Sequence, residues 1–123
     1  MTESDPTLTR SPFLKQLLPL VDFLGEALGE NYEVFLYDLT TKNHPILAIA
    51  NGGLSGRHVG SLMGNVVVKI LDRDSQEMDG PDRLLRRDAM SRSGQRFKSS
   101  TLLIREDGEP VGALCINFNV EPL

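Results

Sequence analysis

The 123-residue sequence contains no tryptophan, one cysteine and two histidines. The lone cysteine, Cys115, cannot form a disulfide within the chain. It stands between Leu114 and Ile116, which indicates a buried, unreactive thiol in a reducing compartment. Because His44, His58 and the cysteine do not have the spacing of metal ligands, we expect no bound metal and no cofactor.

Long apolar runs are also missing. No stretch of about 18 apolar residues could span a membrane, and no basic start followed by an apolar segment indicates a signal peptide. Acidic residues outnumber basic ones by 17 to 13, which disfavours non-specific nucleic-acid binding. The length fits one domain with a core of its own. We therefore expect a cytoplasmic protein with no membrane partner.

The N-terminal part divides at a helix start. Residues 1–11 are polar without periodicity and are expected to be disordered, so we place a single domain at residues 12–123. Ser11 has the character of an N-cap and Pro12 of the first helical residue. Pro19 predicts a kink or two short helices. The resulting amphipathic helix either packs on the core or also pairs with a second copy; its apolar stripe is Phe13, Leu17, Leu20, Val21, Leu24 and Leu28.

The middle of the chain has the pattern of a hairpin followed by helices. Residues 32–39 and 46–50 are rich in branched and aromatic side chains and predict two strands joined by a turn. A glycine-rich loop follows, after which Ser61 is expected to cap a helix, and residues 84–90 suggest a short second helix. Consecutive strands joined by tight turns favour an α+β fold with an antiparallel sheet flanked by helices.

A second hairpin is predicted around Asp107-Gly108, because this pair supplies the positive φ angles of a type I′ turn. A two-residue turn would place Ser100 opposite Cys115 and Lys98 opposite Asn117, whereas a bulge would slip the pairing by one residue. In the unslipped register Lys98, Ser100 and Asn117 share one face. They form either a ligand-contacting patch or the solvated end of a strand.

Several polar residues could contact a ligand. Asp38 closes an apolar strand and either accepts hydrogen bonds from the next turn or binds an ammonium or guanidinium group. Asn51, Ser55 and Arg57 stand in the glycine-rich loop, which lacks the spacing of a phosphate-binding loop. Its glycines either only turn the chain, or Arg57 and His58 meet an anion. Nothing in the spacing favours catalysis by Ser55, His58 and Asp38, and we expect no enzyme.

The one basic region of this acidic sequence precedes the last hairpin. The residues of this region form either a solvent-exposed helix face or a contact surface for a partner domain or an anion. Asp88 is the only acid among its six basic residues, which are Arg83, Arg86, Arg87, Arg92, Arg96 and Lys98.

Four segments, in this order and spacing, resemble the YheO-like PAS domain over about residues 13 to 120. They are Asn31-Tyr-Glu-Val-Phe-Leu-Tyr-Asp-Leu39, Ile49-Ala-Asn-Gly-Gly-Leu-Ser-Gly-Arg57, Lys98-Ser-Ser-Thr-Leu-Leu-Ile-Arg105 and Gly112-Ala-Leu-Cys-Ile-Asn-Phe118. The family often has histidine where this chain has Tyr37, which disfavours a role for a protonatable group at that position.

The resemblance implies a PAS fold and the sensor half of a bacterial transcriptional regulator. Such a sensor would bind a small polar metabolite, for example an amino acid, and signal through a homodimer formed by the N-terminal helix. DNA would be bound only by a helix-turn-helix domain that this chain lacks, so we expect an isolated sensor domain. The alternative is a dimerisation module without a ligand. The candidate ligand-binding residues are Asp38, Asn51, Ser55, Arg57, Lys98, Ser100 and Asn117.

Overall fold

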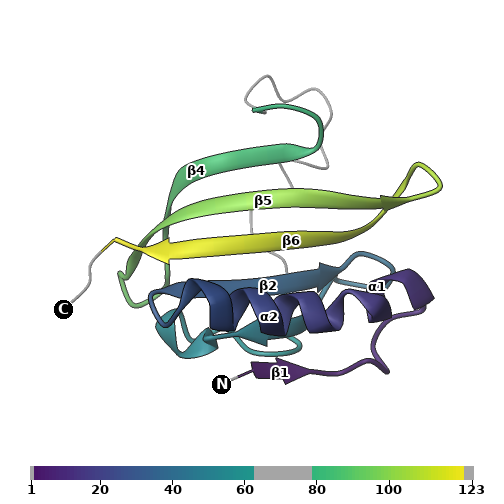
Figure 1. The fold of residues 1–123 in the computed structure, drawn as a ribbon, viewed down its shortest axis with the longest axis horizontal. Coiled ribbons are helices and arrows are strands. Elements are labelled where there is room, and N and C mark those ends of the chain that lie inside the picture. Colours follow the sequence, from purple (N-terminus) through teal and green to yellow (C-terminus); the bar gives the residue numbers. More distant parts are fainter. Residues whose placement is uncertain (1, 63–78, 121–123) are drawn as a thin grey trace.

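The computed structural model describes residues 2–62 and 79–120. These residues contain one antiparallel sheet of six strands in the order β1-β3-β2-β6-β5-β4 (Figure 1). The antiparallel sheet and the α+β class agree with the prediction. The strands are β1 (Thr2–Ser4), β2 (Tyr32–Asp38), β3 (Ile46–Ala50), β4 (Arg83–Met90), β5 (Arg96–Glu106) and β6 (Glu109–Asn119).

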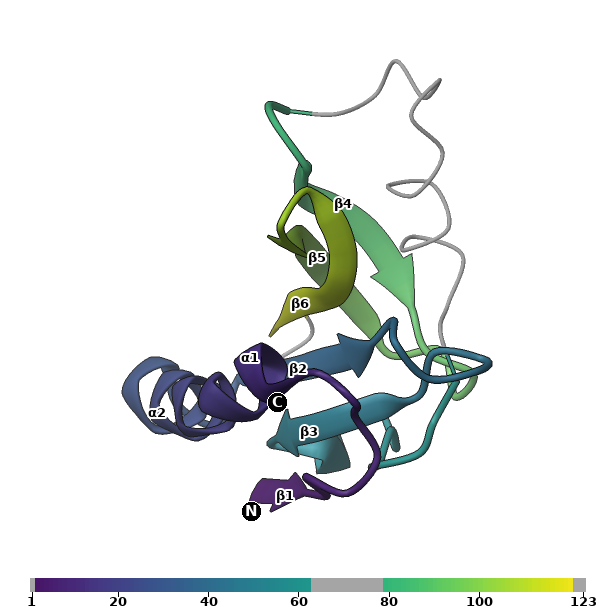
Figure 2. The same ribbon diagram turned by 90° about the vertical axis from the view of Figure 1, so that its right-hand side faces the viewer.

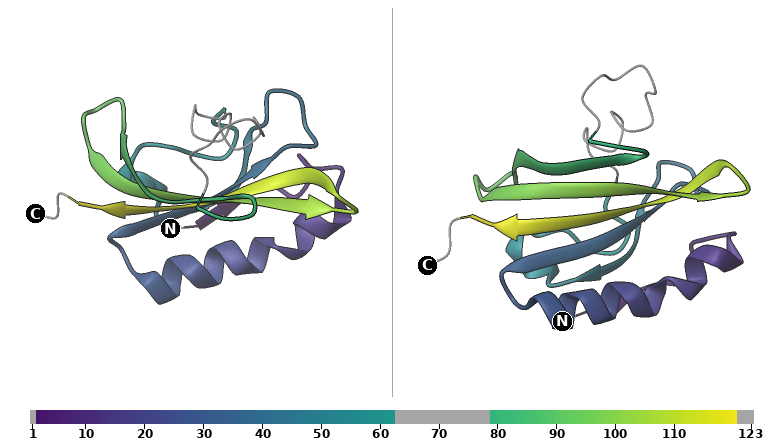
Figure 3. Two further views of the ribbon diagram at one scale, coloured as in Figure 1. Left: turned by 90° about the horizontal axis from the view of Figure 1, so that it is seen from above. Right: turned by 45° about the horizontal axis from the view of Figure 1, so that its top comes forward.

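Two helices, α1 (Pro12–Gln16) and α2 (Leu18–Leu28), lie on one side of the sheet, which we call the helix face (Figures 1 and 3). Ser11 caps α1, because its Oγ accepts a hydrogen bond from the Leu14 amide at 3.2 Å. The two helices separate at Leu17, close to Pro19, where the sequence predicted a break. Neither helix is long and apolar enough to cross a membrane, and no other helix in the described residues is either.

The core has two parts because side chains alternate across β2. Val34 and Leu36 point to the helix face and pack with Leu14 and Val21. Phe35 belongs to a second cluster on the opposite side, which we call the inner face, with Tyr37, Ile49, Ala113 and Cys115. In Figure 3 the loop after β3 lies on this inner side, opposite the helices. Both faces of the central strands are therefore buried.

The hairpin of β5 and β6 turns at Asp107 and Gly108, with φ angles of 51° and 82°, as a type I′ turn requires. The pairing then shifts between Ile104 and Arg105. Ser99, rather than Lys98, consequently stands opposite Asn117.

This shift corrects the predicted faces of the hairpin. Lys98 and Ser100 stand opposite Phe118 and Ile116 on the helix face, whereas Asn117 points to the inner face. The unslipped register was wrong because one irregularity near the turn exchanges the side-chain faces of a whole strand. The predicted shared patch of Lys98, Ser100 and Asn117 does not form.

Two further segments differ from the expectations. Residues 84–90, predicted as a short helix, belong to β4, which pairs with β5. Within residues 1–11, expected to be disordered, Thr2–Ser4 pair with β3 and Thr9 is buried. The hairpin of β2 and β3 was predicted correctly. Of the helix expected after Ser61, nearly all lies outside the described residues.

Candidate functional site

A fully buried carboxyl group lies on the inner face, near the start of β2. Glu33 on β2 stands opposite Asn117 on β6, and Asn117 Nδ2 donates a hydrogen bond to Glu33 Oε1 at 3.1 Å. Ser55 Oγ donates to Glu33 Oε2, and Arg57 Nη1 donates to Oε1 at 3.3 Å. We call Glu33, Ser55, Arg57 and Asn117 the Glu33 cluster. Three separate segments of the chain thus converge on one carboxyl group.

The loop after β3 carries two members of the cluster and is anchored to the end of α2. Asn51 has a left-handed backbone, with φ 60°, which directs the chain out of β3. Its Nδ2 lies 3.3 Å from the carbonyl oxygen of Gly25, 3.2 Å from that of Gly29 and 2.9 Å from that of Tyr32. The side chain therefore connects the loop to the last turn of α2 and to the start of β2. Asn51 holds the loop in place.

Close packing within the loop fixes Arg57 above the sheet. A Cβ atom on Gly52 would lie 2.6 Å from the Arg57 carbonyl oxygen, so only glycine fits there. Ser55 Oγ accepts a hydrogen bond from the Arg57 amide at 3.2 Å. The Arg57 guanidinium lies 5.2 Å from the ring centre of Phe35, a cation–π distance. Arg57 thus bridges an aromatic ring and the buried carboxyl group.

Burial controls the charge of Glu33. Loss of water contact raises the pKa of this carboxyl, and hydrogen bonds from Ser55 and Asn117, together with the charge of Arg57, oppose the shift. The pKa remains above its usual value. The pKa of Glu33 should therefore change whenever one of the surrounding groups is altered.

The side-chain amide of Asn117 has a hydrogen-bond partner for its nitrogen but none for its oxygen among the described residues. The residue is 2% exposed, and its Oδ1 has no hydrogen-bond partner among the described residues. An unpaired buried acceptor costs about 1–3 kcal/mol. Buried polar groups in folded proteins are nearly always paired, so this oxygen calls for an explanation.

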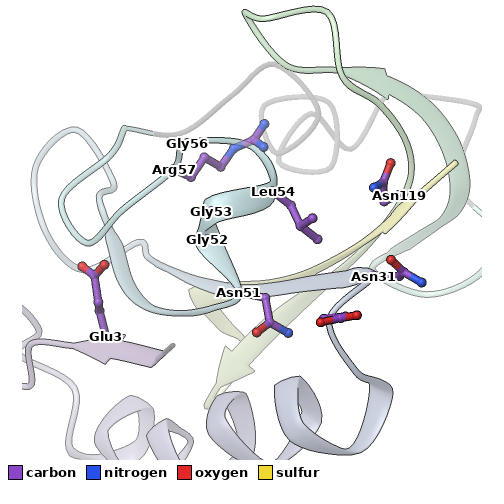
Figure 4. A pocket seen from close by; sticks show the side chains of 10 residues that line it. Glu3, Asn31, Asn51, Gly52, Gly53, Leu54, Gly56, Arg57 and Asn119 are labelled. Atoms are coloured by element: carbon purple, nitrogen blue, oxygen red, sulfur yellow. The ribbon is translucent and has the colours of Figure 1, made fainter. Parts of the chain in front are cut away.

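Two cavities meet at Arg57, whose side chain is 31% exposed. The larger, of about 910 Å³, lies between the loop and the ends of β2 and β6, with Asn31 and Asn119 in its wall (Figure 4). The smaller, of about 600 Å³, is lined by Tyr37 and His58 among others. Arg57 is therefore the member of the Glu33 cluster that is accessible from both cavities.

The inner face also holds the chain's cysteine. Cys115 Sγ lies 3.5 Å from Thr101 Oγ1, and burial raises the pKa of the thiol to about 12. A neutral, enclosed thiol is a poor nucleophile. Within residues 2–62 and 79–120 no cluster of three or more histidine, cysteine or acidic residues could hold a metal ion.

Three of the seven candidate residues, Ser55, Arg57 and Asn117, come together in the Glu33 cluster. Asn51 lines the larger cavity, but its amide group is engaged by backbone carbonyls. The remaining candidates lie elsewhere. Lys98 Nζ pairs with Asp88 at 2.5 Å on the helix face.

The side chains of Asp38 and Ser100 are hydrogen-bonded to residues outside the Glu33 cluster. The Asp38 carboxylate is fully buried and accepts hydrogen bonds from Thr9, Thr40 and Thr41, which corresponds to the turn interpretation. Ser100 Oγ accepts a hydrogen bond from the Arg86 amide at 3.0 Å.

The residues weighed for catalysis have other partners, since Ser55 is hydrogen-bonded to Glu33 and His58 Nδ1 lies 2.9 Å from the Val59 carbonyl oxygen.

Sequence reasoning missed Glu33, the centre of the cluster. A signal was present in the sequence. Glu33 stands in an apolar strand and points to the same face as Phe35 and Tyr37, which are both buried. An acid on such a face needs a partner. The partners could not be identified from β2 alone, since they come from the loop after β3 and from β6.

Comparisons with known proteins assign the sequence to a family. The model of the YheO-like PAS domain matches residues 8–123. YheO of Escherichia coli K12 is 32% identical over 111 residues, which are 88% of this chain and 45% of that protein. The transcriptional regulator DauR of Pseudomonas aeruginosa is 29% identical over 114 residues, 91% of this chain and 50% of that protein. The chain thus spans about half the length of these relatives.

The fold is similar to that of a solved RNA-binding light-oxygen-voltage receptor. The TM-score is 0.54 at 13% sequence identity, over 98% of this chain and 38% of the receptor. At this identity the likeness concerns the fold alone. Family match, relatives and sheet architecture agree, and the chain belongs to the YheO-like PAS domain family.

Proposed function

We propose that this chain is the sensor domain of a transcriptional regulator and binds a small polar metabolite at the Glu33 cluster. Its family and its relationship to the regulator DauR support a regulatory role. The observation that carries the ligand proposal is the open acceptor of Asn117 in an otherwise hydrogen-bonded, buried cluster. Fold alone would not support it, because one fold hosts many functions.

The ligand would supply a hydrogen-bond donor. Asn117 Nδ2 is committed to Glu33, so its amide orientation leaves Oδ1 as an acceptor. A ligand hydroxyl or ammonium group that donates to this oxygen would relieve the desolvation cost of leaving it unpaired. An apolar ligand would not, and the site should discriminate strongly against molecules that lack the donor.

The ligand would also carry a carboxylate. The Arg57 guanidinium has five N–H donors in a planar fork, and Glu33 is bonded through one nitrogen of that fork. Its access to both cavities leaves room for an anion to bind in a bidentate manner. Arg57 Nη1 and Asn117 Nδ2 both lie within 3.3 Å of one Glu33 oxygen, so the two residues are close enough together for one small molecule to contact both. Amino acids and hydroxy acids combine the two groups.

Binding would be transmitted through a homodimer to a DNA-binding domain outside these residues. A ligand shifts a conformational equilibrium only by its difference in affinity for the two states. The second candidate function is a dimerisation module without a ligand. It is favoured by exposed apolar residues on α2, where Phe23 is 62% exposed.

Thermal melting against a matched panel tests the ligand proposal. The panel pairs amino acids and hydroxy acids with amines that lack the carboxylate and with carboxylates that lack the donor. Compounds with both groups should raise the melting temperature, since a ligand at 100 times its Kd stabilises a protein by about 2.7 kcal/mol. Compounds that lack either group should not.

Two variants and two controls locate the binding site. Asn117→Leu and Arg57→Gln should abolish the ligand-induced shift. The exposed residues Asn43 and Arg10 provide matched controls, and Asn43→Gly and Arg10→Gln should retain it. The glycine is tolerated because Asn43 has a φ of 66°. A shift that survives in both site variants would place the ligand elsewhere, and no shift across the whole panel would favour the dimerisation module.

A further inference from the structure

Half of the helix face has no helix over it. The helix α2 contacts β2 and β3, and Figure 2 shows no helix beside β4 and β5 on this side among the described residues. Two adjoining cavities of about 500 and 210 Å³ lie there and share Ser100 and Ile116. We call this region the sheet groove, and its apolar residues are Leu85, Leu102, Leu114, Ile116 and Phe118.

The sheet groove is apolar at its floor and basic at its edge. Leu102 and Phe118 are 38% and 37% exposed, more than expected for strand residues on the buried side of a sheet. Arg83, Arg86 and Lys98 line the cavities. The acids beside this edge each pair with a basic residue, Asp79 with Arg87, Asp82 with Arg105 and Asp88 with Lys98. The edge therefore carries an excess of positive charge on a chain with a net charge of −4.

The helix beside this groove has the opposite character. Leu20, Phe23 and Ala27 follow helical spacing, and all three are exposed. They form an apolar ridge, flanked by Asp22 and Glu26, on a helix that contains no lysine or arginine. Glu26 lies close to the C-terminal end, where the helix dipole disfavours an acid. A basic surface against this end would stabilise it.

We propose that α2 of a second copy packs into the sheet groove, and that the contact is reciprocal across a two-fold axis. Ridge and groove lie side by side on the same face, so a two-fold rotation brings each ridge onto the other copy's groove. Phe23 would insert between Leu102 and Phe118 as an aromatic anchor. Asp22 and Glu26 would face the basic edge. This inference rests on the homodimer of the proposed function and names the surface that forms it.

Charge reversal gives a test with an internal rescue. The helix variant Asp22→Lys/Glu26→Lys and the groove variant Arg83→Glu/Arg86→Glu each place like charges together, and each should raise the dimer dissociation constant at least about tenfold. Mixing the two variants should yield a heterodimer. In that pair, one contact joins the reversed helix to the reversed groove, and the other joins the two native surfaces.

Analytical ultracentrifugation of the 123-residue chain, with one variant fluorescently labelled, measures both effects. The control Lys42→Glu changes an exposed charge in the turn between β2 and β3 and should leave the dissociation constant unchanged. Phe23→Ala should weaken the dimer at least about tenfold. Because Phe23 is mostly exposed in the protomer, this variant should retain its melting temperature at concentrations where both proteins are monomers.

The outcomes separate this surface from the rest of the proposal. A wild-type chain that is monomeric at all accessible concentrations overturns both the homodimer and the surface. A dimer that resists all of these variants, or two variants that form no heterodimer on mixing, overturns the surface alone. Ligand-induced melting shifts in Phe23→Ala, measured on the monomer, report the Glu33 cluster independently of either result.

Discussion

Asn117 and Glu33, which are 84 residues apart in the sequence, are joined by a hydrogen bond of 3.1 Å from the amide of one to the carboxyl oxygen of the other. The bond links β6 to β2 in the middle of the sheet. It uses the donor of Asn117 and leaves the acceptor open. The stability of the domain and its proposed ligand binding consequently depend on the same pair of residues.

The pH dependence of stability should reveal the buried Glu33. Burial raises the pKa of its carboxyl in the folded protein above the value in the unfolded chain. The folded state therefore retains its proton longer, and the stability that Glu33 contributes is fully present below the unfolded pKa and lost as pH rises through the folded pKa. Glu33→Gln removes this titration. Relative to the wild type, its free energy of unfolding should increase from pH 4.5 to pH 8, by about 1.4 kcal/mol for each unit of pKa difference.

Urea unfolding of both proteins across this pH range measures the difference. Arg10→Gln, which changes an exposed charge, should give a curve parallel to that of the wild type. If the advantage of Glu33→Gln instead shrank as pH rises, the carboxylate would be stabilised by Arg57 more than burial penalises it.

Replacing Asp38 should destabilise the fold without affecting ligand binding. Its buried carboxylate joins β2 to the N-terminal segment through hydrogen bonds from Thr9, Thr40 and Thr41. Asp38→Ala leaves these hydroxyl groups without their charged acceptor and should cost about 2–3 kcal/mol of unfolding free energy. The matched variant Asp5→Ala removes a carboxylate that serves the exposed Thr7, and its loss should be much smaller. Equal losses for the two variants would contradict this role for Asp38.

A methyl group at Gly25 should separate α2 from the sheet. A Cβ atom there would lie 2.3 Å from the Cβ of Ala50 on β3, too close for any side chain. Gly25→Ala should therefore lower the unfolding free energy by about 1–3 kcal/mol, although alanine is the better helix former. Gly53→Ala is the control, because no atom of the described residues lies within 4 Å of the place that its methyl group would take. Thermal melting distinguishes the two, and a stabilised Gly25→Ala would show that the helix can move away without loss.

The thiol of Cys115 should be unreactive in the folded protein. Burial raises its pKa to about 12, so the thiolate that reacts with alkylating and disulfide reagents is scarce near neutral pH. Ellman's reagent should detect almost no thiol at pH 8 in buffer and one thiol per chain in guanidinium chloride. Rapid labelling of the folded protein would mean that the inner face opens frequently.

The elements that depend on local sequence could be predicted, and those that depend on distant partners could not. The Ser11 cap, the break near Pro19 and the turn at Asp107 and Gly108 follow from the residues at those positions. The shift between Ile104 and Arg105 has only an indirect signal in Pro110, which pairs with Arg105 and cannot donate a ladder hydrogen bond, yet it determines whether Lys98 lies on the same face as Asn117. One misplaced residue in the pairing therefore changed the predicted site.

The strand β4 shows how tertiary pairing overrides local preference. Its sequence, Arg-Leu-Leu-Arg-Arg-Asp-Ala-Met, consists mostly of good helix formers, which is why a helix was predicted. In the fold it pairs along β5, with an irregularity between Leu84 and Arg87. Glu33 was not predicted as a site residue for a related reason, because its partners Ser55, Arg57 and Asn117 are distant in the sequence.

The strand β6 presents Asn117 to the inner face and its neighbours Ile116 and Phe118 to the sheet groove. A single backbone thus carries the proposed metabolite contact and the proposed subunit contact on alternate residues. A displacement at one side chain moves the next, because adjacent residues share a peptide plane. Any such coupling is reciprocal: the factor by which the metabolite changes the dimer constant is also the factor by which dimer formation changes metabolite affinity. The sheet itself, without a hinge or lid, would then carry the signal between the two sites.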